Sequence, residues 1–167
     1  MRAIFLDRDG VINVERGDYT YKIRDFRIIP NIIASLMWCK NNNFLRIVAT
    51  NQSGISQGIY TTAEMKQCHE YFQDTSGHLI DAFYYAPWHP SISRSLSRKP
   101  DSLMFERAIA RFQLDPLQCW MVGDKERDLI PARQLGMTTI MIGGQSEFAD
   151  YRIGEVGELP MVIEQHQ

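Results

Sequence analysis

The chain opens with a short apolar run that ends in two closely spaced acids. Residues 3–6 are all apolar, Asp7 and Asp9 follow, and Gly10 comes next. An unbroken run of this kind is typical of a strand buried on both faces, as at the centre of a parallel sheet. Ligands bind beyond the carboxyl ends of such strands, which is where both carboxylates would lie. Because two carboxylates this close repel each other, the pair indicates a metal site, an acid–base role or both. The alternative is a strand that merely ends in solvated charges.

Apolar runs recur along the chain, and segments with helical spacing separate them. The sequence predicts strands at residues 3–6, 44–49, 81–86, 119–122 and 138–142, with a weaker one near 161–163. It predicts helices from residue 30 to the asparagines at 41–43, over about 61–75, over about 102–112, and between the fourth and fifth strands. Alternating strands and helices favour a parallel sheet with helices on both faces and right-handed crossovers. We therefore expect a single Rossmann-like α/β domain over residues 1–167.

The helix after the fourth strand contains a proline, which restricts where that helix begins. Proline is tolerated in the first turn but removes a hydrogen bond deeper in a helix. We therefore expect Pro131 in the first turn, with Asp128 as the N-cap residue. The other interpretation of Asp128 is a carboxylate that supports a metal site, and the sequence favours the two equally.

Composition narrows the class of protein and its partners. The net charge is −2 and no dense block of lysine and arginine occurs, so we expect no nucleic-acid partner. No apolar stretch reaches the ~20 residues of a membrane span, so we expect no membrane partner. The cysteines, Cys39, Cys68 and Cys119, are widely spaced and odd in number, which is typical of reduced thiols. These features predict a cytoplasmic protein, and the sequence predicts no particular oligomeric state.

The predicted strands share polar residues at their carboxyl ends. Thr50 and Asn51 follow the second strand, Asp124 and Asp128 follow the fourth, and the loop after the third carries Lys99. In a parallel sheet these ends lie along one edge, so the groups converge with the two acids of the first strand. Carboxylate oxygens suit Mg²⁺, while hydroxyl, amide and ammonium groups donate hydrogen bonds to phosphate. The arrangement predicts a phosphoryl-transfer site that acts on a small phosphorylated molecule.

Four ordered motifs give the chain a family resemblance. They occupy residues 5–13, 48–55, 98–100 and 121–125, and they read FLDRDGVIN, VATNQSGI, RKP and MVGDK. In this order and spacing they resemble the motifs of the haloacid dehalogenase (HAD) superfamily of phosphatases. Within it the chain is most similar to the D-glycero-D-manno-heptose 1,7-bisphosphate and histidinol-phosphate phosphatases. The resemblance implies an HAD-like fold, and no large cap domain is inserted here.

The resemblance also implies catalytic and metal-binding roles. Asp7 would be the nucleophile that forms an aspartyl-phosphate, and Asp9 the general acid and base. The metal ligands would be the side chains of Asp7 and Asp124 and the main-chain carbonyl of Asp9. Lys99 would balance the negative charge of Asp7 and the phosphate. The cofactor implied is Mg²⁺.

The residues that bind the substrate follow from the same motifs. Thr50 and Asn51 would hold the oxygens of the transferring phosphoryl group. A second set would line the approach and meet the rest of the substrate: Gln52, Ser53, Arg98 and Lys125.

The chain departs from this subgroup in the loop after the third predicted strand. The subgroup usually binds zinc there through Cys-x-His and Cys-x-Cys, and the aligned positions here are Ala86, Trp88, Ser95 and Ser97. None of these side chains binds zinc as a thiolate or imidazole does, so we expect no zinc. A second departure is Gln57, where the heptose group more often has a basic residue. One contact to a second substrate phosphate is therefore expected to be missing.

The leading hypothesis is an Mg²⁺-dependent phosphomonoester hydrolase that acts on a small phosphosugar. The resemblance makes D-glycero-D-manno-heptose 1,7-bisphosphate the first candidate substrate, with histidinol phosphate or another small metabolite as the alternative. A more distant alternative is a binding protein that kept this fold and lost turnover. The complete set of Asp7, Asp9, Lys99 and Asp124 argues against it.

Overall fold

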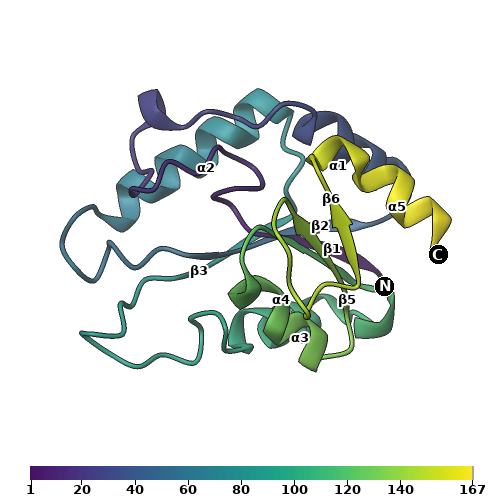
Figure 1. Ribbon diagram of the computed structural model, residues 1–167. Coiled ribbons are helices and arrows are strands. Elements are labelled where there is room, and N and C mark those ends of the chain that lie inside the picture. Colours follow the sequence, from purple (N-terminus) through teal and green to yellow (C-terminus); the bar gives the residue numbers. More distant parts are fainter. Residues whose placement is uncertain (167) are drawn as a thin grey trace.

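A six-stranded parallel sheet forms the centre of the protein (Figure 1). The structure is a computed structural model, and it describes residues 1–166. In spatial order the strands are β3 (Ala82–Ala86), β2 (Leu45–Asn51), β1 (Ala3–Leu6), β4 (Trp120–Gly123), β5 (Thr138–Ile142) and β6 (Tyr151–Ile153). Every neighbouring pair is parallel, as the alternation of strands and helices predicted.

The order of the strands creates a crevice beside β1. From β1 the chain moves outward through β2 to β3, then crosses back to β4 on the other side and continues to β5 and β6. The two halves of the sheet therefore wind in opposite directions from the β1–β4 boundary. Such a switch point opens a crevice at the carboxyl ends of the strands, where ligands bind in open α/β sheets.

Helices cover both faces of the sheet (Figure 1). One face packs against α1 (Ile32–Asn41), α2 (Thr62–Ser76) and α5 (Leu159–Gln165), and the other against α3 (Leu103–Phe112) and α4 (Glu126–Gln134). Alternate residues of β1 serve the two cores, since Ile4 and Leu6 belong to the first and Ala3 and Phe5 to the second. Burial on both sides explains why this strand is apolar throughout.

The end of the chain differs from the sequence prediction. The residues near 161–163 form no strand but lie within α5, which has Pro160 in its first turn. Leu159, Val162 and Ile163 are buried, and their spacing is that of one helical face. The sixth strand is instead Tyr151–Ile153, which was not predicted because a strand of three residues at the sheet edge carries almost no pattern.

The start of α4 also differs from the prediction. Lys125 is the N-cap residue, and Asp128 is the third residue of the helix, where its carboxylate accepts a hydrogen bond from the Lys125 backbone N–H at 3.1 Å. The helix therefore begins earlier than expected, and Pro131 lies in its interior instead of its first turn. Asp128 caps the helix from inside while its other oxygen stays available for another partner.

The cysteines and the open sheet agree with the sequence predictions. The three cysteines are buried and unpaired. No helix within residues 1–166 is long and apolar enough to cross a membrane. The sheet is open, with short 3-10 helices at Ile23–Asp25, Pro116–Gln118 and Val156–Glu158 and no large inserted cap domain.

Candidate active site

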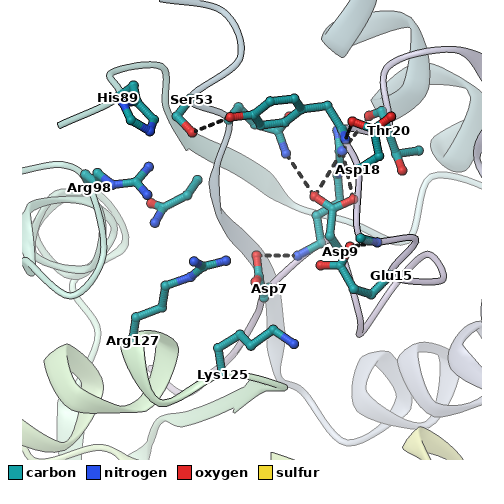
Figure 2. Close-up of a pocket in the computed structure, with 15 residues that line it drawn as sticks. Asp7, Asp9, Glu15, Asp18, Thr20, Ser53, His89, Arg98, Lys125 and Arg127 are labelled. Carbon is teal, nitrogen blue, oxygen red and sulfur yellow. Dashed lines mark hydrogen bonds and ion pairs between the residues drawn. The ribbon is translucent and has the colours of Figure 1, made fainter. Parts of the chain in front are cut away.

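The carboxyl ends of β1, β2 and β4 meet beneath a cavity of about 560 Å³ (Figure 2). Seven of the residues predicted for the site line this cavity: Asp7, Asp9, Asn51, Gln52, Ser53, Arg98 and Lys125. The other three, Thr50, Lys99 and Asp124, lie directly beside it and contact or adjoin the lining residues. The structure therefore brings all the predicted site residues to one edge of the sheet, as the motif positions implied.

Asp7 is the first residue beyond β1 and lies at the floor of the cavity. Its backbone N–H donates to the carbonyl of Val122, so the parallel pairing with β4 continues to this residue. One carboxylate oxygen accepts the Arg8 backbone N–H at 2.7 Å and lies 3.0 Å from the Lys99 ammonium. Burial and the nearby Asp128 carboxylate together raise the pKa of Asp7 from its ordinary value to about 7, against the opposing effect of Lys99.

Lys99 is buried and uses its whole ammonium group within the protein. Its Nζ lies 2.7 Å from Asp128 Oδ1 and 3.0 Å from Asp7 Oδ1, and it donates to the Ala49 carbonyl at 2.8 Å. These three partners account for the three N–H donors. Burial alone lowers the pKa of Lys99, but the two carboxylates outweigh it and raise the pKa above its ordinary value. Lys99 is therefore a fixed positive charge beside Asp7.

Three carboxylates form an acidic cluster on this edge. One oxygen from each of Asp7, Asp124 and Asp128 lies within 4.8 Å of the others. Burial also raises the pKa of Asp124, whose Oδ2 pairs with Lys125 Nζ at 3.0 Å. A Cβ on Gly10 would lie 2.3 Å from Asp124 Oδ2, so the close approach of this carboxylate requires glycine.

The donor set fits a hard divalent cation. Asp124 Oδ1 is buried and has no hydrogen-bond donor among residues 1–166. A buried carboxylate oxygen without a donor is costly unless a cation completes its coordination. Carboxylate and carbonyl oxygens are the ligands that Mg²⁺ prefers. Asp128, which the sequence left open between an N-cap and a metal-supporting carboxylate, is the third residue of α4 instead of its N-cap, and one of its oxygens lies in the acidic cluster.

Asp9 lies beside the cavity and accepts hydrogen bonds from three side chains. Arg8 Nη2 donates at 2.9 and 3.0 Å to its two oxygens, Asn13 Nδ2 at 2.9 Å and Gln52 Nε2 at 3.1 Å. Arg8 is buried and also donates to the Thr20 carbonyl at 2.6 Å. These contacts fix the Asp9 carboxylate at one wall of the cavity (Figure 2).

Asn51 ties the loop that carries Lys99 to the end of β2. Its amide nitrogen donates to the Lys99 carbonyl at 3.1 Å, and its amide oxygen accepts the Lys99 backbone N–H at 3.0 Å. Thr50, in the same strand, is fully buried and accepts a hydrogen bond from Gln52 at 3.0 Å. The two residues predicted to hold phosphate thus also hold their neighbours in place.

Several residues of the cavity walls were not predicted. Glu15 and Asp18 lie on one side, and His89 and Arg127 lie on the other (Figure 2). Tyr19 also lines the cavity. Arg127 adjoins the GDK motif, which could have drawn attention to it. The others lie in irregular segments, where no periodicity places a side chain.

The two guanidinium groups on this second side have no carboxylate partner. No ion pair joins Arg98 or Arg127 to an acid within residues 1–166, and Arg98 Nη1 is buried without a hydrogen-bond acceptor. Burial and the positive charge of Arg127 lower the pKa of Arg98. Two like charges on one wall, one of them short of an acceptor, are suited to an anion.

The positions aligned with zinc ligands lie in and after β3. Ala86 ends that strand, Trp88 is partly exposed, and Ser95 and Ser97 hydrogen-bond to each other through their hydroxyl oxygens at 2.8 Å. The prediction that the chain binds no zinc rests on these side chains.

A buried carboxylate beside a fixed ammonium, with an acidic cluster at a switch point, is the arrangement expected of a phosphoryl-transfer enzyme of the α/β class. Comparison with known proteins agrees. Residues 96–152 match the HAD-hydrolase-like family model. The D-glycero-beta-D-manno-heptose-1,7-bisphosphate 7-phosphatase of Haemophilus ducreyi is 35% identical over 147 residues, covering 83% of this chain and 80% of that protein. That of Haemophilus influenzae is 33% identical, covering 97% and 96%.

A solved structure extends the likeness over the whole fold. The D,D-heptose 1,7-bisphosphate phosphatase from B. bronchiseptica, in complex with magnesium and phosphate, superposes with a TM-score of 0.90 at 24% identity and covers 100% of both chains. The chain therefore belongs to the HAD-like phosphatases, in the family of the heptose-1,7-bisphosphate 7-phosphatases.

Proposed function

We propose that this protein uses Mg²⁺ to remove the 7-phosphate of D-glycero-D-manno-heptose 1,7-bisphosphate through an aspartyl-phosphate intermediate. The observation that carries the chemistry is Asp7, a buried carboxylate at the cavity floor that is 3.0 Å from a fixed ammonium. The substrate comes from the relatives, which share about a third of their residues with this chain and carry that activity in their names.

In the proposed mechanism Asp7 is the nucleophile, and Asp9 is the general acid and then the general base. An oxygen of Asp7 attacks phosphorus while the bond from phosphorus to the sugar oxygen breaks. Asp9 gives its proton to that oxygen, so the product leaves as an alcohol. Asp9 then takes a proton from water, whose oxygen attacks the aspartyl-phosphate, and inorganic phosphate and the Asp7 carboxylate are released. Lys99 stays protonated throughout and offsets negative charge on Asp7 and the phosphoryl oxygens.

The acidic cluster would hold the metal ion. The ligands would be the carboxylates of Asp7 and Asp124 and the main-chain carbonyl of Asp9, with Asp128 beside them. When bound, Mg²⁺ neutralises charge on the phosphoryl oxygens and fixes their position. The buried, donor-free oxygen of Asp124 supports this assignment.

The two sides of the cavity suit the two ends of a phosphosugar. Arg98 and Arg127 would bind the phosphate that is not transferred, because neither guanidinium group has an acid partner among the described residues. Glu15 and Asp18, on the opposite side, would accept hydrogen bonds from sugar hydroxyl groups (Figure 2). Gln57, where the heptose group more often has a basic residue, donates to the Tyr19 hydroxyl at 2.9 Å. Arg127 would supply a positive charge to this cavity in its place.

A phosphate-release screen tests the proposal. The folded protein is assayed with and without Mg²⁺ against heptose 1,7-bisphosphate, heptose 7-phosphate, histidinol phosphate and glycerol 2-phosphate. We expect release from the bisphosphate with the highest kcat/KM, and loss of activity when the metal is chelated.

The possible results separate the parts of the proposal. A preference for histidinol phosphate would overturn the substrate alone. No release from any substrate by folded, Mg²⁺-loaded protein would overturn the enzymatic function and favour a binding protein. Stoichiometric zinc in a metal analysis would contradict the argument from residues 86–97.

A further inference from the structure

The side-chain amide of Gln52, the first residue beyond β2, makes all its hydrogen bonds within the protein. Gln52 is 2% exposed. Its Oε1 accepts a hydrogen bond from the Tyr60 hydroxyl at 2.6 Å, and its Nε2 donates to Thr50 Oγ1 at 3.0 Å and to Asp9 Oδ2 at 3.1 Å. A primary amide has two N–H donors, and both are used here. No donor of Gln52 remains for a ligand, although the residue borders the cavity.

These partners determine which way the amide faces. In the reverse orientation the amide oxygen would face the Asp9 carboxylate, so that two acceptors would meet. The Tyr60 hydroxyl supports the observed orientation from the other end. Burial raises the pKa of Tyr60 above its ordinary value, so the hydroxyl keeps its proton and donates a hydrogen bond to Gln52.

The packing of neighbouring residues fixes the position of the Tyr60 ring. Tyr60 is 3% exposed and stacks on Tyr21, with ring centroids 4.9 Å apart and planes 6° from parallel. Tyr19 packs against it at 5.6 Å. On the remaining side a Cβ on Gly54 would lie 2.2 Å from the Tyr60 ring, so the glycine leaves space that the ring fills. The hydroxyl is therefore delivered to Gln52 by a rigid aromatic cluster.

We propose that Tyr60 is a positioning residue: through Gln52 it holds the Asp9 carboxylate in the orientation that transfers a proton to the leaving oxygen. Tyr60 lies outside the four motifs and touches neither the substrate cavity nor Asp9. Tyr60 acts indirectly, because it orients the Gln52 amide, and that amide donates a hydrogen bond to the Asp9 carboxylate. The inference rests on the proposed phosphatase activity but on no particular sugar.

The test uses the dependence of proton transfer on the leaving group. Glycerol 2-phosphate releases an alkoxide that needs a proton, whereas 4-nitrophenyl phosphate releases a phenolate that leaves without one. Tyr60→Phe removes only the hydroxyl. We expect kcat/KM to fall about tenfold for the alkyl ester and less than about twofold for the aryl ester. A loss of mere stability or metal affinity would lower both values together.

Two further variants show whether Tyr60 acts through Gln52. In Gln52→Leu the amide is gone, so the alkyl-to-aryl ratio of kcat/KM should fall as in Tyr60→Phe. In the double variant the second change should have no further effect on that ratio. Tyr21→Phe is the matched control, because it removes a hydroxyl from the neighbouring ring and keeps the ring that stacks on Tyr60. Its ratio should equal that of the unmodified protein.

An unchanged ratio in Tyr60→Phe would overturn the inference, and so would effects that multiply in the double variant. Either result leaves the proposed function standing, provided that the unmodified protein hydrolyses both esters. If the unmodified protein hydrolyses neither, the activity fails, and with it the role of Asp9 on which the inference depends.

Discussion

Strand β2 has a buried charge at each end, and the two ends balance that charge in different ways. At its start Arg46 is 7% exposed and pairs with Asp81 at 2.9 Å. The same guanidinium donates to the carbonyls of Leu79 at 2.8 Å and Phe44 at 2.6 Å. One positive charge meets one negative charge, and each of the three guanidinium nitrogens has an acceptor. We call such an ion pair closed, because its charges are balanced within the protein.

At the other end the charges do not balance. The Lys99 ammonium contacts both Asp7 and Asp128, and Asp124 adds a third carboxylate within the same 4.8 Å cluster. Lys125 pairs with Asp124 only from the exposed side. One oxygen of Asp124 has no donor within the described chain. Burial, together with the nearby Asp128 carboxylate, raises the pKa of Asp7.

The difference separates a structural ion pair from a functional one. A satisfied pair contributes to stability and offers no group to a ligand. A cluster with unbalanced charge lowers the free energy of unfolding of the ligand-free protein, and a bound cation and phosphate raise it again. Substitutions at the two ends should therefore have opposite effects on stability and activity.

The largest effect is expected for Asp7→Asn. The amide cannot attack phosphorus, so kcat should fall by at least about a thousandfold. At the same time the free energy of unfolding of the metal-free protein should rise by on the order of 2 kcal/mol near neutral pH, because a buried carboxylate is removed from an acidic cluster. Phosphate-release kinetics and urea unfolding measure the two effects.

Asp81→Asn is the matched control at the other end of β2. It makes the same chemical change in a closed pair, so it should lower the free energy of unfolding and keep kcat/KM. Appreciable turnover by Asp7→Asn, or a loss of stability as large as that of the control, would contradict the comparison.

The second effect concerns Arg46→Met. The change removes the charge partner of the Asp81 carboxylate, which keeps only the backbone N–H of residue 46 at 2.7 Å, and it removes the Arg46 donors to the Leu79 and Phe44 carbonyls. The free energy of unfolding should fall by about 3 kcal/mol, as for other broken buried pairs. The folded fraction should retain the kcat/KM of the unmodified protein. A change in kcat/KM after correction for folding would show that this end is not purely structural.

The sequence was sufficient to place the charged groups of the floor. Asp7, Thr50 and Asp124 each follow an apolar run, and parallel strands bring such ends to one edge. Lys99 is different, because it lies in a loop and only the family motif assigned it. Its position depends on Asn51 and Asp128, whose contacts span 48 and 29 residues of sequence and have no local pattern.

The cavity walls could not be predicted in this way. Glu15 and Asp18 lie in the irregular segment after β1, where the backbone path decides which side chains face inward. Asp128 was misplaced as an N-cap because the proline rule suggested a later start for α4 than Lys125 provides. The tail was misread since Pro160 and a helical apolar face overrode a short β-branched run.

A third, smaller effect should appear in the response to Mg²⁺. The raised pKa of Asp7 means that its protonated form stabilises the metal-free protein at low pH, and this stabilisation is lost as the pH rises through about 7. Mg²⁺ needs the carboxylate form and competes with the proton. Saturating Mg²⁺ should therefore stabilise the protein by about 2–3 kcal/mol near pH 8 and much less near pH 5.5.

Thermal unfolding with Mg²⁺ or a chelator measures this response. Asp7→Asn should lose most of the stabilisation by Mg²⁺ at the higher pH, whereas Arg46→Met should retain it. A shift in Tm that is equal at both pH values would show that the cation binds away from Asp7.

The smallest effect extends the comparison to the cavity wall, where guanidinium groups lack the carboxylate that Arg46 has. Arg127→Gln removes one of the two charges proposed to bind the phosphate that is not transferred. Because Arg127 is exposed to solvent, KM for the bisphosphate should rise only about threefold to fivefold, with kcat nearly constant. The KM for heptose 7-phosphate, which lacks that phosphate, should change less, as steady-state kinetics on both substrates will show.

Arg133→Gln makes the same change in the same helix, but Arg133 pairs with Asp150 at 3.4 Å and faces away from this cavity's lining. It should leave both KM values unchanged. Equal increases for the bisphosphate and the monophosphate in Arg127→Gln would indicate that Arg127 only attracts anions at a distance. A selective increase that high salt weakens only partly would place the second phosphate in direct contact with this wall, since direct contacts are screened less than long-range attraction.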